Sequence, residues 1–201
     1  MIRRYLVMLI LLMGLAMGIV ACGGAAATHE FAGAELVETE PLPDFTLTAA
    51  GDTPVSLSDF RGQYVYIYFG YTYCPDFCPT TLAKLANVRE KMGDEADRMQ
   101  VIMITVDPER DTPDVLAGYV QAFDPTFIGL TGAPDDIAAA AGSLGVFFQR
   151  TDGSAGTGYV VDHSTRTYLI GPDGRALIAY PYDAEAEAIA ADLRWLLDRD
   201  S

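Results

Sequence analysis

Cysteine, histidine, tryptophan and basic side chains are all scarce in this chain. Its 201 residues include three cysteines, two histidines and one tryptophan. Three cysteines are too few for the disulfide framework of a small secreted protein. A structural zinc site is also disfavoured, because it needs four protein ligands and we find only three suitable ones.

Basic residues are outnumbered by acidic ones, 13 to 28, which gives a formal charge of −15. A surface of that sign repels the phosphate backbone of nucleic acids. Nucleic acid is therefore excluded as a partner, whereas a metal cation or a basic protein patch is compatible with the charge.

One long apolar run, residues 5–20, follows Arg3 and Arg4. Its length and flanks predict a signal peptide over residues 1–21. The run ends in Ile-Val-Ala-Cys, which resembles the cleavage box of bacterial lipoproteins, so Cys22 is the predicted lipidation site. An uncleaved membrane anchor is the alternative. Both place the protein on the extracytoplasmic face of a bacterial membrane, and cleavage would remove two arginines and leave a charge of −17.

Residues 22–41 are rich in glycine and alanine and then acidic, which predicts a flexible tether. Residues 42–201 are long enough for one domain. Its first part, residues 43–57, has two short apolar stretches around Ala-Ala-Gly-Asp and predicts a β-hairpin leading into the domain.

Residues 64–82 form the stretch around which the rest is arranged. Tyrosines alternate with Val65, Ile67 and Phe69, as in a central strand buried on both faces. Gly70 ends this strand, and Cys74 and Cys78 follow, each before a proline. With Pro79 at the first helical position, both sulfurs would lie at or just before a helix N-terminus, where the helix dipole favours thiolate.

Two thiolates one helical turn apart can bind a soft metal or form a disulfide. The predicted Cα separation of roughly 5–6 Å suits a disulfide, and thiolate is also the preferred ligand of Cu(I). A purely redox pair more often has the shorter spacing C-x-x-C. Two inert structural cysteines are the remaining alternative, which placement between prolines disfavours.

The remainder alternates between helical and extended patterns. This order predicts an α/β sheet with helices on both faces. Helices are predicted at residues 80–92, 114–123, 134–144 and 184–197, and strands at 101–106, 127–130, 146–150, 167–170 and 176–180.

Two further segments carry polar residues at positions of interest. Residues 107–113, Asp-Pro-Glu-Arg-Asp-Thr-Pro, follow a strand; we interpret them as a structural turn in which Arg110 bridges acids, and a role in partner docking stays open. His163 follows a glycine-rich connection, residues 151–158, that is either a mobile loop or a hairpin end. A lone histidine is more often structural than a ligand.

Three motifs together resemble the Sco/SenC family of copper-binding assembly factors for cytochrome c oxidase. They are FGYTYCPDFCP at 69–79, VDPERDTPDVL at 106–116 and VDHSTRTYLIGPDG at 161–174, and the resemblance covers residues 42–197. It implies a thioredoxin-like fold with a central mixed sheet, and Cys74, Cys78 and His163 as copper ligands. Phe77 departs from the smaller aliphatic residue expected there and is not a ligand position.

The resemblance implies a metallochaperone that delivers copper to the binuclear copper site of cytochrome c oxidase subunit II. Other periplasmic copper chaperones or thiol reductases are further expected partners. Two alternatives remain: a thiol-disulfide reductase using Cys74 and Cys78 as a redox disulfide to keep the oxidase cysteines reduced, and a copper or redox sensor. His163 separates them, because a reductase does not need it. Asp162 is a candidate to orient His163 through a hydrogen bond.

Overall fold

The structure, a computed structural model, describes residues 29–152 and 158–200. The predicted signal peptide and the lipidation site Cys22 lie outside this part of the chain. Among the described residues, no helix combines the length and apolar character needed to cross a bilayer.

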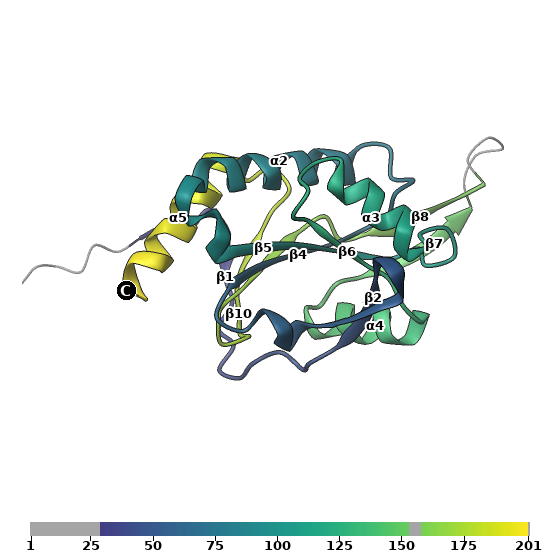
Figure 1. Ribbon diagram of the computed structural model, residues 1–201, viewed down its shortest axis with the longest axis horizontal. Coiled ribbons are helices and arrows are strands. Elements are labelled where there is room, and N and C mark those ends of the chain that lie inside the picture. Colours follow the sequence, from purple (N-terminus) through teal and green to yellow (C-terminus); the bar gives the residue numbers. More distant parts are fainter. Residues whose placement is uncertain (1–28, 153–157, 201) are drawn as a thin grey trace, which may run out of the picture. The chain divides into compact units, whose positions relative to one another are not determined.

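A six-stranded mixed sheet forms the centre of the domain (Figure 1). Its order is β1-β10-β9-β4-β5-β6; β4, β5 and β6 run parallel, and the pairs β4–β9, β9–β10 and β10–β1 are antiparallel. The strands are β1 (Ala34–Glu35), β4 (Tyr64–Gly70), β5 (Met99–Thr105), β6 (Ile128–Leu130), β9 (Thr167–Ile170) and β10 (Ala176–Tyr180).

Strand β4 is central because both of its faces carry large apolar side chains. All seven of its residues are buried, and β5 and β9 flank it on either side. Burial on both faces explains why β4 is a continuous apolar run rather than an alternation of apolar and polar residues. The prediction of a central strand at 64–69 is confirmed.

Helices cover both faces of the sheet, as predicted. In Figure 1, α2, α3 and α5 lie over one face and α4 lies over the other. Their bounds are α2 (Phe77–Met92), α3 (Pro113–Gln121), α4 (Pro134–Ser143) and α5 (Ala186–Arg199). This mixed sheet, with its first helix directly after the central strand, is the thioredoxin-like fold.

Two hairpins stand outside the central sheet. The predicted one consists of β2 (Thr46–Ala49) and β3 (Thr53–Ser56), joined by a 3₁₀ turn, η1 (Ala50–Asp52). The second pairs β7 (Phe148–Asp152) with β8 (Tyr159–His163) as a separate two-stranded sheet. Strand β8 was not predicted; its pairing shows that the glycine-rich connection joins two strands. Two more 3₁₀ segments are η2 (Leu57–Phe60) and η3 (Gly93–Arg98).

The domain begins earlier than predicted. The expectation of a free tether up to residue 41 is wrong for its last part, because the compact unit starts at Phe31. Strand β1 pairs with β10, the Ala32 amide donates to Asp192 (3.0 Å), and the Phe31 ring packs edge-on against Trp195 at 5.2 Å. The polar composition of this stretch concealed these contacts, which only the folded β10 and α5 provide.

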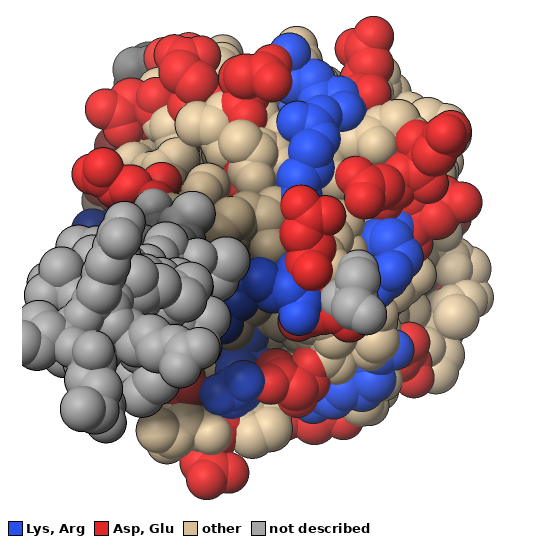
Figure 2. Space-filling model, turned by 90° about the vertical axis from the view of Figure 1, so that its left-hand side faces the viewer, with Lys and Arg blue, Asp and Glu red and all other residues tan. Residues whose placement is uncertain are grey.

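Acidic side chains are spread across the surface shown in Figure 2, with a band of Lys and Arg between them. Some acidic and basic side chains of the domain form ion pairs, such as Lys91 with Glu187 at 2.6 Å.

Candidate metal centre

The cysteine turn joins the end of β4 to the start of α2. Helix α2 begins at Phe77 with Asp76 as its N-cap, so Cys78 is the second helical residue and Pro79 the third. The predicted first position for Pro79 is therefore wrong by two residues. A proline is tolerated there because the first four amide groups of a helix have no partner within the helix. Cys74 stands two residues before the N-cap, as expected.

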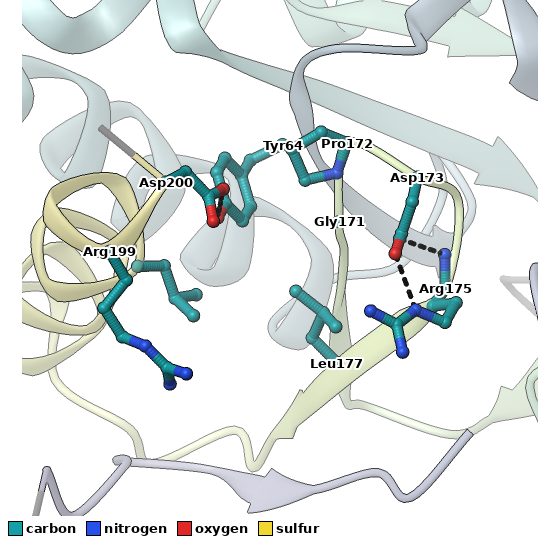
Figure 3. A pocket seen from close by; sticks show the side chains of 9 residues that line it. Tyr64, Gly171, Pro172, Asp173, Arg175, Leu177, Arg199 and Asp200 are labelled. Atoms are coloured by element: carbon teal, nitrogen blue, oxygen red, sulfur yellow. Dashed lines mark hydrogen bonds and ion pairs between the residues drawn. The ribbon is translucent and has the colours of Figure 1, made fainter. Parts of the chain in front are cut away.

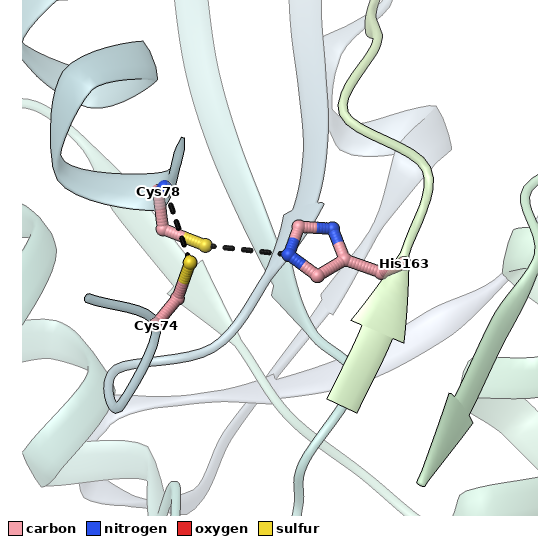
Figure 4. A group of neighbouring side chains, drawn as sticks. All are labelled: Cys74, Cys78 and His163. Carbon is pink, nitrogen blue, oxygen red and sulfur yellow. Dashed lines mark hydrogen bonds between the residues drawn. The ribbon is translucent and has the colours of Figure 1, made fainter. Parts of the chain in front are cut away.

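Cys74, Cys78 and His163 come together although Cys78 and His163 are 85 positions apart in the sequence (Figure 4). Their ligand atoms all lie within 4.8 Å of one another. The Cys78 Sγ is 3.6 Å from the His163 Nε2, and the Cys78 amide donates to the Cys74 Sγ at 3.4 Å. Both cysteines are free thiols. The structure thus assembles the three residues that the sequence singled out.

Hydrogen bonding fixes the orientation of the His163 ring. Its Nδ1 lies 3.0 Å from the carbonyl oxygen of Ser164. A carbonyl can only accept, so Nδ1 is the donor in this contact, and Nε2 is the ring nitrogen that faces the Cys78 sulfur. The rings of Tyr68 and Tyr71 pack edge-on against the imidazole at 6.0 and 5.8 Å and hold its plane.

Asp162 does not have the predicted orienting role. It is exposed, because successive side chains of β8 point to opposite faces and His163 faces the sulfurs. The orienting acceptor is the Ser164 carbonyl instead. A backbone acceptor leaves no side-chain signal in the sequence, so sequence reasoning could not find it.

The two thiols have opposite tendencies to ionise. The hydrogen bond from the Cys78 side chain lowers the pKa of Cys74 to about 3, against the opposing effect of burial. The same hydrogen bond, together with burial, raises the pKa of Cys78. The pair therefore shares one proton: Cys74 is the thiolate and Cys78 the donor. Cys74 retains 7% exposure and Cys78 none.

Two residues of β4 shape the sulfur side of the site and were missed as site residues. The Tyr68 hydroxyl donates to the Cys78 Sγ at 3.5 Å. A Cβ on Gly70 would lie 2.8 Å from that same sulfur, closer than atoms can approach. Strand alternation could have assigned Tyr68 to the face beneath α2, but not its contact with sulfur.

A cavity of about 370 Å³ lies away from these donors (Figure 3). Tyr64, Pro172 and Asp200 contribute to its wall, and Asp173 pairs with Arg175 at 2.6 Å beside it. No thiol or imidazole lines it, so it is separate from the cluster of Cys74, Cys78 and His163.

Two thiols at the strand-to-helix turn and an imidazole from β8 that faces them define a thioredoxin-like protein with a histidine beside its thiol pair. The SCO1/SenC family model matches residues 35–198. The chain therefore belongs to the SCO1/SenC family.

Relatives in several organisms support this membership. The chain is 41% identical to the mitochondrial SCO2 homolog of Mus musculus over 153 residues, which cover 75% of this chain and 60% of that protein. The apo Sco1 protein from Thermus thermophilus has 40% identity and a TM-score of 0.76, covering 85% of this chain and 99% of that one. The copper-bound ScoI of Bradyrhizobium japonicum has 38% identity and a TM-score of 0.70, covering 77% and 98%. The chain thus spans only about 60% of the length of the mouse relative.

Proposed function

We propose that this protein carries copper, binding one ion through Cys74, Cys78 and His163 and passing it to the binuclear copper site of cytochrome c oxidase subunit II. The observation that supports this most directly is the convergence of two sulfurs and one imidazole nitrogen within 4.8 Å. A related structure, ScoI of Bradyrhizobium japonicum, has copper bound.

The donor set fits copper in both oxidation states. Thiolate sulfur is the preferred ligand of Cu(I), and an added imidazole nitrogen suits Cu(II). Ligation requires deprotonated sulfur, which Cys74 already provides. Cys78 would lose its proton on binding, and the His163 Nε2 already faces the sulfurs.

A carrier must also release its cargo to an acceptor. Cys74 stands in the loop before α2 and keeps a little exposure, which gives an incoming acceptor thiol a side from which to exchange ligands. The strongly acidic composition favours a partner with a basic docking patch. Lipidated Cys22, or an uncleaved N-terminal segment, would keep the carrier at the membrane where an oxidase subunit resides.

A thiol-disulfide reductase is the second candidate, favoured by the unequal thiols. A reductase needs one thiolate that attacks and a second thiol that resolves the mixed disulfide. Cys74, with its lowered pKa, would be the attacking sulfur and the buried Cys78 the resolving one. The imidazole has no part in that chemistry.

The two functions separate in one pair of assays. The copper-loaded protein is mixed with a reduced, metal-free subunit II fragment, and the purple absorption of the binuclear centre is followed. In parallel, the metal-free, reduced protein is mixed with the oxidised fragment, and free thiols are followed. A carrier forms the centre in the first assay, and His163→Ala impairs it.

The second assay needs a reference, because any exposed dithiol reduces disulfides to some extent. Only a rate well above that of a small-molecule dithiol counts as catalysis. If copper never moves while reduction is fast and indifferent to His163→Ala, the carrier proposal fails and the reductase function stands.

A further inference from the structure

His163 belongs to an element that the central sheet does not hold through strand pairing. Among the described residues, β7 and β8 pair only with each other. The position of the imidazole relative to the sulfurs therefore depends, besides the short link into β9 and the Tyr68 ring on β4, on side-chain contacts between this hairpin and the cysteine turn. One is direct, from the Val161 amide to the Tyr71 hydroxyl at 3.4 Å.

Arg110, in the loop after β5, touches both elements. Its guanidinium carbon lies 3.7 Å from the ring centre of Tyr159 on β8 and 4.7 Å from that of Tyr73 in the cysteine turn. Its Nη1 donates to the Tyr159 carbonyl at 3.2 Å. Cation–π contacts of this kind hold a ring and a guanidinium plane in fixed relation.

Asp107 completes the hairpin side of this contact. It accepts hydrogen bonds from the Arg110 Nε and, at 2.7 Å, from the Tyr159 hydroxyl. Arg110 and Tyr159 are thus joined through a shared, buried carboxylate as well as through the ring contact. Such charge-assisted hydrogen bonds are stronger than neutral ones.

The same loop is fixed to the cysteine turn by Asp111, which is fully buried. It accepts from the amide and hydroxyl of Thr72, at 3.0 and 2.5 Å, and from the Thr105 hydroxyl at 2.6 Å. Thr72 stands two residues before Cys74. Asp111 therefore binds this short loop to the cysteine turn. Asp107 and Arg110 bind the same loop to Tyr159 on the strand that carries His163.

We infer that Arg110 is a positioning residue: it sets the distance between His163 and the two sulfurs by clamping the β7–β8 hairpin to the cysteine turn. The inference rests on the proposed copper function for its consequence, but not for the clamp itself. The predicted turn at residues 107–113 thus gains a specific role. Among the described residues, Arg110 forms an ion pair with one acid, Asp107, rather than bridging several.

The clamp requires a guanidinium rather than any positive charge. The flat group meets aromatic rings on two elements and donates from Nε and Nη1 at once, which a lysine ammonium on a flexible stem cannot do. The Arg110 Nη2 is buried without a hydrogen-bond partner among the described residues.

Arg150 offers a matched control. Its guanidinium carbon lies 3.5 Å from the same Tyr159 ring, and it pairs with Glu109 at 2.9 Å. Both of these partners are outside the cysteine turn. Arg110→Gln and Arg150→Gln thus each remove one positive charge that lies over the Tyr159 ring. Only Arg110→Gln also removes a contact with the cysteine turn.

The first readout is amide hydrogen exchange in the metal-free protein. In Arg110→Gln and Arg110→Lys, the Val161 amide, which donates to the Tyr71 hydroxyl, should exchange about tenfold faster, equal to about 1.4 kcal/mol, while the Tyr66 amide in β4 keeps its rate. Arg150→Gln should change the hairpin rates less than about threefold. If Arg110→Gln does not fold, Tyr159→Phe, which loses only the hydroxyl bond to Asp107, should show a smaller increase confined to the hairpin.

The second readout is the affinity of the protein for Cu(II) and Cu(I). Arg110→Gln should weaken Cu(II) binding about tenfold and Cu(I) binding less than about threefold, and nitrogen hyperfine coupling in the Cu(II) spectrum should diminish. Unchanged hairpin exchange in Arg110→Gln, or equal effects of the Arg110 and Arg150 variants, overturns the inference. If the wild-type protein binds no copper, the proposed function fails, while the exchange data still decide whether Arg110 clamps the hairpin.

Discussion

Cys74 and Cys78 are chemically different although the sequence presents them as a symmetric pair. Each precedes a proline, yet only Cys78 lies inside α2. Cys78 is fully buried and donates toward the Cys74 sulfur, so the negative charge of the pair rests on Cys74. The residue nearer to solvent is therefore the one ready to meet a metal or another thiol.

We expect Cys74 to stay reactive in acid. Its pKa of about 3 lies below the usual thiol value, so the thiolate persists as the pH falls and is lost only near that pKa. Alkylation of the reduced, metal-free protein by iodoacetamide should vary less than about threefold between pH 5 and pH 8, whereas a free thiol with a pKa of about 8.5 slows about tenfold per unit. Peptide mapping should find the label on Cys74. A free-thiol profile would contradict the assigned ionisation.

His163 should matter unequally to the two oxidation states. Cu(I) is satisfied mainly by sulfur, whereas Cu(II) gains from imidazole nitrogen. His163→Ala should therefore weaken Cu(II) binding by at least about tenfold more than Cu(I) binding, measured by competition titrations with ligands of known affinity. Cys74→Ser and Cys78→Ser should abolish both. Equal losses in His163→Ala would make the histidine a structural residue.

At the scale of the element, the end of β4 sets how closely α2 can approach the sheet. Gly70 lies directly beneath Cys78, and a Cβ there would stand 2.7 Å from the Tyr68 ring and 2.8 Å from the Cys78 sulfur. Both neighbours are buried. Only a residue without a side chain lets the helix seat its second residue against the strand.

Gly70→Ala should lower the free energy of unfolding by about 1–3 kcal/mol, the usual cost of overpacking a core. It should also weaken copper binding, because the Cys78 sulfur is displaced. Gly118→Ala is the control: Gly118 lies in α3 with open space around its Cα, and alanine there should stabilise by about 0.5–1 kcal/mol. Urea unfolding of the metal-free Gly70→Ala and Gly118→Ala variants measures both changes in stability. Equal stability of the Gly70→Ala variant and the wild type would contradict the predicted clash.

At the scale of the whole domain, the segment from Phe31 onward adds an edge strand to the sheet and packs the Phe31 ring against Trp195 of α5. Besides the β1–β10 pairing, the Leu36 amide donates to the Leu177 carbonyl at 2.8 Å. Gly33 permits this close approach, since a Cβ would lie 2.6 Å from Ile178. The segment therefore belongs to the folded unit.

Truncation should reveal this contribution. A chain lacking residues 1–28 should keep the thermal stability of the domain, whereas one lacking residues 1–41 should melt about 4–8 °C lower, equal to roughly 2 kcal/mol. The reason is the loss of β1, the Phe31–Trp195 contact and the hydrogen bond to Asp192. Equal melting temperatures in calorimetry would show that the segment contributes nothing.

The sequence by itself determined the fold class and the three candidate ligands. The unbroken apolar run of β4, the Gly-Pro-Asp-Gly turn between β9 and β10 and the helical spacing of α2 are local signals, because strand burial, turn chemistry and helix periodicity each act over a few residues. The spacing of Cys74 and Cys78, one helical turn apart, was enough to predict metal binding or disulfide formation. His163 was assigned as a candidate ligand only through the motif resemblance, because a single histidine has no spacing pattern from which a role can be predicted.

Only the tertiary structure decided how those residues act together. The Ser164 carbonyl in place of Asp162, the Tyr68 hydroxyl on the Cys78 sulfur, and the Arg110 contacts to two aromatic rings all join residues distant in sequence or depend on which face a strand presents. The docking of residues 31–41 likewise required a folded β10 and α5. Such contacts are set by long-range packing, for which a single sequence holds no local pattern.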